Sequence, residues 1–384
     1  MRRRRFYVPV LCLLLLCTSL TLPVAADTES ASGETLPPTY QDFIGELPED
    51  LTDRLPDGIF SDNSEEVGSA ATQMSDFSYL LQTVLSLVGV RLGSCARLLA
   101  SIAGLLILSA VCKLLQSSFK GEKIARAFSL CTTLIILLAL LTQGYESIRS
   151  VTDYFSTLRG VTAASIPLMG SLYAMGGNVS AAAASSTGLS LFLAVFEEIV
   201  GRSIVPFCAV CLAFALVSAL DPSIRLQTLS GTIKKNYTTV LAFLMMLLLA
   251  MLGAQTTLGA KSDTLAMKSV KFAAGNMIPV VGGSVSELLR TLGASIGYLR
   301  GAVGICGILL LILLLLPTLI ELFLVRLTWQ LGASLADILG CDTEKKLLEE
   351  FASINGYLIT AVIICSVVPI LSFTLFLRCA SALG

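Results

Sequence analysis

The 384-residue sequence is 55% hydrophobic and only 14% charged, whereas soluble domains carry about 25% charged residues. This balance excludes an ordinary water-soluble fold and indicates that the bilayer is the solvent. The chain has no histidine, the commonest general base and transition-metal ligand. Any enzyme activity would then rest on carboxylates, Lys, Ser or Cys, and an intramembrane enzyme that uses Glu197, Glu198 or Glu321 is one alternative. We expect no enzyme activity, no metal, no cofactor and no nucleic-acid partner.

Residues 1–26 have the plan of a secretory signal peptide. Basic Arg2–Arg5 precedes the apolar run Phe6–Leu20, and Val24-Ala25-Ala26 offers small residues at a cleavage site before Asp27. An uncleaved signal anchor is the alternative. Both place the following residues outside the cytoplasm.

Residues 27–76 form an acidic extracytoplasmic segment with 13 acids, one base (Arg54) and four prolines. A segment of this composition buries little surface, and we expect it to be a solvated spacer. The alternative is an acidic docking arm for a basic partner.

The remaining chain predicts an all-α, polytopic membrane protein with about seven to nine transmembrane or re-entrant segments. Residues 77–94 predict an amphipathic helix in the membrane interface, and residues 95–384 the membrane domain. The basic loop from Lys113 to Arg126 predicts a cytoplasmic loop and an N-terminus outside. The clearest apolar runs are Cys95–Leu115, Ala127–Gln143, Thr187–Gly201, Ile204–Leu220, Thr238–Leu258, Gly301–Leu327 and Leu358–Leu377.

Two apolar segments, Val161–Gly177 and Phe272–Gly283, each contain an Ile-Pro pair, and they either cross fully or dip in and return. A shift of about 112 residues places Pro167 on Pro279. This predicts an internal duplication, with repeats at about 95–201 and 204–327 and a last span at 358–377; chance alignment is the alternative. Transporter folds often arise by duplication, so an autonomous secondary transporter is one candidate function. Substrate flux from purified protein in liposomes is its test.

Charged residues inside apolar stretches are the next candidates, because carboxylates in a membrane are costly and mark function. Glu197 and Glu198 lie near Arg202, so an interfacial ion pair is their simpler explanation. Glu321 lies inside a long apolar run and is the most isolated acid. Residues 342–351 predict a charged, solvated loop.

The segment Lys268–Gly283 combines bases, glycines, an asparagine and a proline in apolar chain. Pro279 removes a helical hydrogen bond and frees carbonyl groups, while glycines let helices approach closely. The segment is a candidate conduit lining with Asn276 as its polar group and Pro167 as the earlier counterpart; a kinked packing helix is the alternative.

The run Lys271–Gly282 resembles the signature stretch of the stage III sporulation protein AE family. The residues that match its motif are Lys271, Gly275, Asn276, Pro279 and Gly282, and Met277 stands where an aromatic residue is expected. The plan of signal peptide, acidic segment and successive spans is similar as well.

The resemblance implies a membrane subunit of a multi-protein assembly in the mother-cell membrane around the forespore. There it forms or lines a conduit. Its implied partners are membrane lipid, the other stage III A sporulation proteins and a forespore-side protein. The sequence lacks a phosphate-binding Gly loop, so ATP-driven transport requires a separate ATPase. The resemblance implies no catalytic residue.

Overall fold

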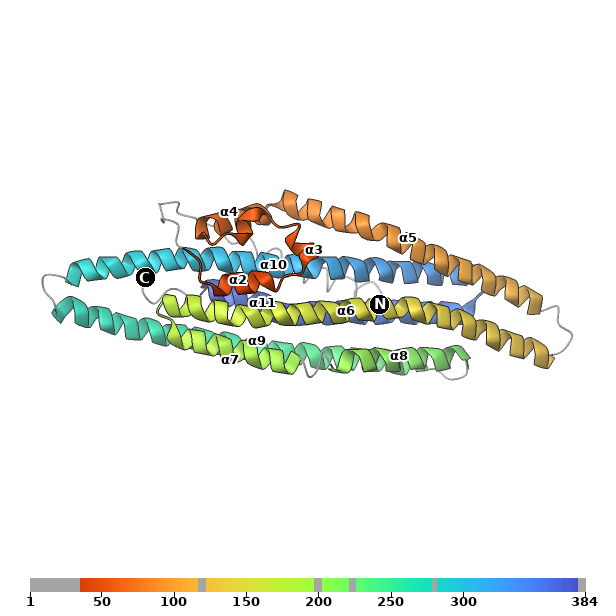
Figure 1. Cartoon of the computed structure of the whole chain (residues 1–384). Helices are drawn as coiled ribbons and strands as arrows, with labels where there is room; N and C mark the ends of the chain where they lie inside the picture. Colours follow the sequence, from red (N-terminus) through yellow and green to blue (C-terminus); the bar gives the residue numbers. More distant parts are fainter. Residues whose placement is uncertain (1–34, 117–121, 197–201, 221–225, 278–281, 379–384) are drawn as a thin grey trace.

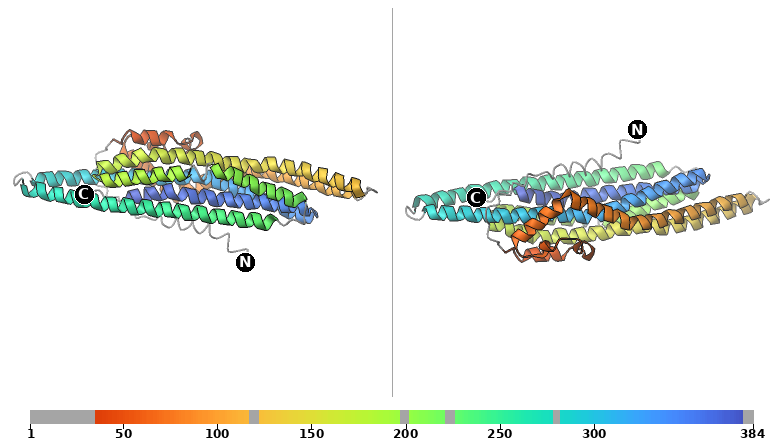
Figure 2. Two further views of the ribbon diagram at one scale, coloured as in Figure 1. Left: turned by 90° about the horizontal axis from the view of Figure 1, so that it is seen from below. Right: turned by 90° about the horizontal axis from the view of Figure 1, so that it is seen from above.

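The computed structural model is an elongated bundle of antiparallel helices (Figures 1 and 2). It describes residues 35–116, 122–196, 202–220, 226–277 and 282–378. Within these ranges the only β pairing is an isolated bridge between Thr35 and Asn63. The predicted all-α class is confirmed. The signal peptide lies outside the described residues and stays a prediction.

Four short helices come first: α2 (Thr39–Gly45), α3 (Glu49–Thr52), the 3-10 helix η2 (Asp57–Phe60) and α4 (Ser64–Ser75). We call residues 35–76 the N-terminal lobe. The bundle helices follow in the order α5 (Phe77–Gln116), α6 (Glu122–Met175), α7 (Val179–Phe196), α8 (Arg202–Leu220), α9 (Leu226–Met277), α10 (Gly282–Ile338) and α11 (Asp342–Arg378).

Several bundle helices are much longer than a bilayer is thick. Helix α10 has 57 residues, or about 85 Å at 1.5 Å per residue, against about 30 Å of hydrocarbon. Five described helical segments are long and apolar enough to cross a membrane: Ser78–Leu115, Val179–Phe196, Leu229–Ser269, Gly293–Ile338 and Asp342–Arg378. Within the described residues the apolar runs of the sequence therefore lie on helices, and on long helices such as α6, α9 and α10 they occupy only part of the length.

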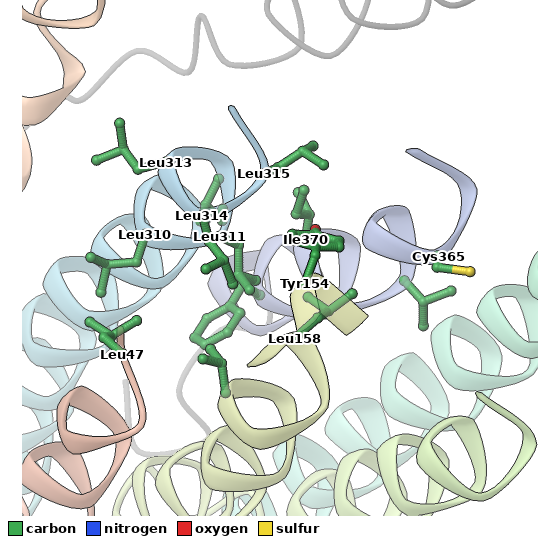
Figure 3. Packing of buried hydrophobic residues seen from close by; sticks show 14 of the residues in the cluster. Leu47, Tyr154, Leu158, Leu310, Leu311, Leu313, Leu314, Leu315, Cys365 and Ile370 are labelled. Carbon is green, nitrogen blue, oxygen red and sulfur yellow. The ribbon is translucent and has the colours of Figure 1, made fainter. Parts of the chain in front are cut away.

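The centre of the bundle is the pair α10 and α11. Leu310, Leu311 and Leu313–Leu315 of α10 and Ile370 of α11 are buried with Tyr154 and Leu158 of α6 (Figure 3). Gly307 lies directly against the ring of Phe373, so the lack of a side chain there allows the close helix contact. This core fixes the register of the helices around the site described below.

The N-terminal lobe corrects the expectation of a solvated spacer. Tyr40, Phe43 and Ile59 are fully buried, and the Phe43 ring lies 5.8 Å from that of Phe373 of α11. The Tyr40 hydroxyl donates to the Ile59 carbonyl at 2.9 Å, and burial raises the pKa of this phenol. Apolar residues spaced between the acids supply the buried side, while carboxylates such as Asp42 and Glu46 stay exposed.

Helix α5 runs without interruption through residues 77–116, so the structure has no boundary between the expected interfacial helix 77–94 and the span after it. The physical reason is that the stretch contains no proline, and an isolated glycine such as Gly93 is tolerated inside a helix.

Residues 342–351 are the start of α11 and not the expected solvated loop. Gly340, with φ of 67°, ends α10 in the left-handed conformation that glycine readily adopts. Asp342 and Glu344 then begin α11, where carboxylates favour the positive end of the helix dipole. Glu344 and Glu350 are buried, at 3% and 6% exposure.

Candidate functional site

A charged cavity of about 400 Å³ lies between the N-terminal lobe, α5, α6 and α10. Its charged lining residues are three arginines and three carboxylates: Arg54, Arg91, Arg149, Glu146, Asp153 and Glu321. The Arg91 side chain is 45% exposed, so the cavity reaches the surface.

Helical spacing creates these walls. The α5 wall consists of Tyr79, Thr83, Leu87 and Arg91, each four residues apart and therefore on one helix face. Glu146, Arg149 and Asp153 form a similar charged stripe on α6. The Tyr79 hydroxyl donates to the Arg54 carbonyl at 2.7 Å, which joins the lobe to α5 at the edge of the cavity.

Glu321 is paired across the bundle, and not isolated as its apolar sequence context indicated. Arg91 Nη2 lies 3.1 Å from Glu321 Oε2, and the Glu321 side chain is 21% exposed. Such a partly solvated pair contributes at most about 1 kcal/mol to stability. Its partner is 230 residues away in the chain, so no local pattern identifies it.

The cavity lies level with the most apolar part of the bundle. The Tyr154 hydroxyl is 2.6 Å from Ser366 Oγ, in the middle of the apolar run of α11. On α9, Tyr237 lies against Tyr357 with ring centroids 5.7 Å apart, and Gly253 contacts Leu375. The stretch of α9 level with Ser366 therefore falls midway between Tyr237 and Gly253.

That stretch of α9 has a large apolar surface. Phe243, Met246 and Leu247 are 67%, 71% and 56% exposed, as expected for side chains that face lipid. At one level along the bundle, the molecule thus has an apolar surface on α9 and charged groups around the cavity. Charged groups at bilayer depth are costly unless they face water or protein. The side of the bundle that holds the cavity must therefore face water or another protein.

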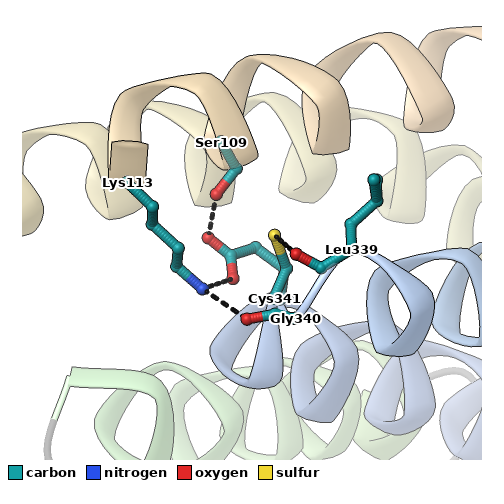
Figure 4. Close-up of polar contacts among 6 residues, drawn as sticks. Ser109, Lys113, Leu339, Gly340 and Cys341 are labelled. Carbon is teal, nitrogen blue, oxygen red and sulfur yellow. Dashed lines mark hydrogen bonds and ion pairs between the residues drawn. The ribbon is translucent and has the colours of Figure 1, made fainter. Parts of the chain in front are cut away.

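Two further polar clusters lie between the helices. Lys234 Nζ of α9 is 2.5 Å from Glu350 Oε1 of α11, with both side chains under 10% exposed. At the end of α5, Ser109 donates to Glu344 at 2.6 Å, and Lys113 contacts Glu344 and the Gly340 carbonyl (Figure 4). Both clusters connect helix pairs and lie away from the cavity lining.

The backbone of the motif, as far as the structure describes it, lies away from the cavity. Lys271, Gly275 and Asn276 lie in the last turns of α9, and Gly282 begins α10, but their side chains and all of Pro279 lie outside the described residues. From Gly282 to Leu313 of the cavity wall, α10 runs 31 residues, or about 46 Å. The motif therefore marks a different region, at the end of the bundle where α9 and α10 meet (Figure 1).

The other sequence candidates lie apart from one another. Pro167 is an exposed residue inside α6, whose helix continues to Met175. Arg202 is the exposed first residue of α8. Glu197 and Glu198 lie outside the described residues. Among the predicted site residues that the structure describes, only Glu321 lines the cavity.

Sequence reasoning missed Glu146, Arg149 and Asp153 because they lie between two apolar runs, where charged residues are expected in a loop. Their spacing of three and four residues was the available signal, since it places all three on one face of a helix.

A family model described as stage III sporulation protein AE matches residues 64–380. The stage III sporulation protein AE of Bacillus subtilis (strain 168) is 24% identical over 302 residues, which cover 78% of this chain and 73% of that protein. No solved structure matches the chain.

Proposed function

Because the chain belongs to the stage III sporulation protein AE family and so has a role in sporulation, we propose that it is a membrane subunit of the mother cell–forespore channel complex. In this proposal its N-terminus lies outside the cytoplasm, and the charged cavity lines a conduit. The other stage III A proteins, a forespore-side protein and a separate ATPase are the proposed partners. The proposal assigns no reaction to the chain.

The observation that supports this function best is the charged cavity at the level of the apolar helix surfaces. Six ionisable side chains line it, and each is costly beside hydrocarbon unless it faces water or protein. Assembly with partner subunits resolves this cost by placing the cavity side against water and protein.

A cavity-filling substitution tests the proposal. Thr157 lines the cavity, and Thr157→Trp places a large ring in it without changing any charge. The variant replaces the chromosomal gene in a sporulating host, and heat-resistant spores and late forespore gene expression are measured. We expect both to fall at least tenfold.

Thr152→Trp is the matched control, because Thr152 lies on the same helix, is exposed and does not line the cavity. Immunoblots of the membrane fraction confirm equal protein levels. Normal sporulation of the Thr157→Trp variant would show that the cavity is not part of a conduit. Loss of sporulation in Asn276→Leu/Pro279→Ala alone would instead favour the motif at the α9–α10 end.

A further inference from the structure

We propose that the cavity binds a zwitterion that carries one anionic group and one primary ammonium group. A phosphatidylethanolamine headgroup and a free small zwitterion such as phosphoethanolamine share this chemistry. The proposal rests on the proposed function, since it names what occupies the same cavity.

The charges of the cavity are incompletely matched within the chain. Arg91 and Glu321 pair with each other, whereas Arg54, Arg149, Glu146 and Asp153 form no ion pair with any residue that the structure describes. Two cations and two carboxylates therefore face one space without partners. All four residues are exposed, so a ligand can reach them from the open side of the cavity. A ligand with a single charge pairs with only one of these sets, whereas a zwitterion pairs with both.

Arg54 and Arg149 suit the anionic end of the ligand. The guanidinium group offers a planar fork of N–H donors that matches phosphate or carboxylate oxygens in a bidentate arrangement. Arg54 comes from the lobe and Arg149 from α6, so an anion between them contacts two separate elements. Thr318 also lines the cavity and offers a hydroxyl group.

Glu146 and Asp153 suit the ammonium end, and α10 adds a further acceptor. Pro317 lines the cavity together with Leu313, and a proline has no N–H for the carbonyl four residues before it. The Leu313 carbonyl is thus not used by the regular helical bond. A primary ammonium has three donors for such acceptors, whereas a quaternary choline group has none. The chemistry therefore favours ethanolamine over choline.

The volume agrees with a ligand of this size. About 400 Å³ is near the lower end of ligand pockets, enough for a headgroup but not for acyl chains. The acyl chains of a lipid ligand have an apolar surface close by on α5, where Leu85 and Val90 are 61% and 69% exposed.

The test is native mass spectrometry of the full-length protein in micelles with equal amounts of phosphatidylethanolamine, phosphatidylcholine and phosphatidylglycerol. We expect about tenfold preferential retention of phosphatidylethanolamine over each of the other two, from the loss of one charged hydrogen-bond set. In lipid-free micelles, binding of free phosphoethanolamine identifies the small zwitterion as a sufficient ligand. If phosphatidylethanolamine is retained but free phosphoethanolamine does not bind, the ligand is the lipid.

Arg149→Gln and Asp153→Asn each remove one charge and keep a polar side chain, and each should reduce the preference about tenfold. Lys268→Gln is the control, because Lys268 is exposed on α9 and does not line the cavity. Equal retention of all three lipids with no binding of phosphoethanolamine, or unchanged preference in both cavity variants, overturns the proposal. This binding result is independent of sporulation by Thr157→Trp, so either proposal can fail alone.

Discussion

The buried pair Lys234–Glu350 allows a quantitative test of how α9 and α11 are held together. Glu350 Oε1 accepts from Lys234 at 2.5 Å and from Ser230 at 2.6 Å, and Lys234 also donates to Ser353 at 2.9 Å. With side-chain exposures of 7% and 8%, solvent screens the pair little. Removal of one partner leaves the other charge buried, which costs about 3–5 kcal/mol.

We therefore expect Glu350→Gln and Lys234→Met each to lower the free energy of unfolding by about 3 kcal/mol or more. The double variant should cost much less than the sum, because it leaves no unpaired charge. The shape of the two side chains is nearly kept, so cavities contribute little to the difference.

Unfolding can be followed in mixed micelles titrated with SDS. The chain has one tryptophan, and Trp329 is fully buried and stacked on Phe351 at 4.8 Å. Its fluorescence thus reports on the residue next to Glu350. Additive losses in the double variant, or single losses below about 1 kcal/mol, would refute the buried pair.

Three further outcomes follow from the packing. Phe43→Ala should cost about 3–5 kcal/mol of local stability, and limited proteolysis should then cleave the lobe before the bundle; unchanged protection would contradict the packing of the lobe on α11. Gly307→Ala places a methyl group into the Phe373 ring and should lower the free energy of unfolding by about 1–3 kcal/mol. Gly301→Ala on the same helix has open space around it and should be neutral or stabilising by up to about 1 kcal/mol. Equal effects of the two variants in SDS titration would argue against the contact between Gly307 and Phe373. Arg300→Lys keeps the charge but loses the planar stacking between Tyr173 and Phe376, so we expect a lower thermal midpoint in detergent, and a midpoint equal to the wild type would show that stacking contributes nothing.

Sequence patterns predicted the class of the fold better than the extent of its elements. The apolar runs correctly mark helices, because hydrophobicity over about 20 residues is a local property. The helix ends depend on tertiary contacts: residues 342–351 are helical with Glu344 and Glu350 buried because Ser109 and Lys234, far away in the chain, supply their partners. No local pattern contains that information.

The candidate site was predictable only in part, for the same reason. Glu321 was identified by its unusual context, but Arg91 and the α6 stripe required knowledge of which helix faces meet. The motif residues Lys271, Asn276 and Pro279 stay a prediction, since their side chains are not described.

The contact between the lobe and the bundle has a consequence for biosynthesis. Tyr40 of the lobe lies beside Cys306 of α10, with the hydroxyl 3.7 Å from the sulfur and 266 residues between them in the chain. At roughly 5–20 residues per second, the ribosome needs about 13–53 s to make the partner surface after the lobe has emerged. During that delay the lobe lacks the surfaces of α10 and α11, although α5 and α6 are already made. Its many carboxylates and prolines then keep the unpacked lobe soluble and prevent premature β-pairing. This explains why a segment with the composition of a disordered chain is folded in the finished protein.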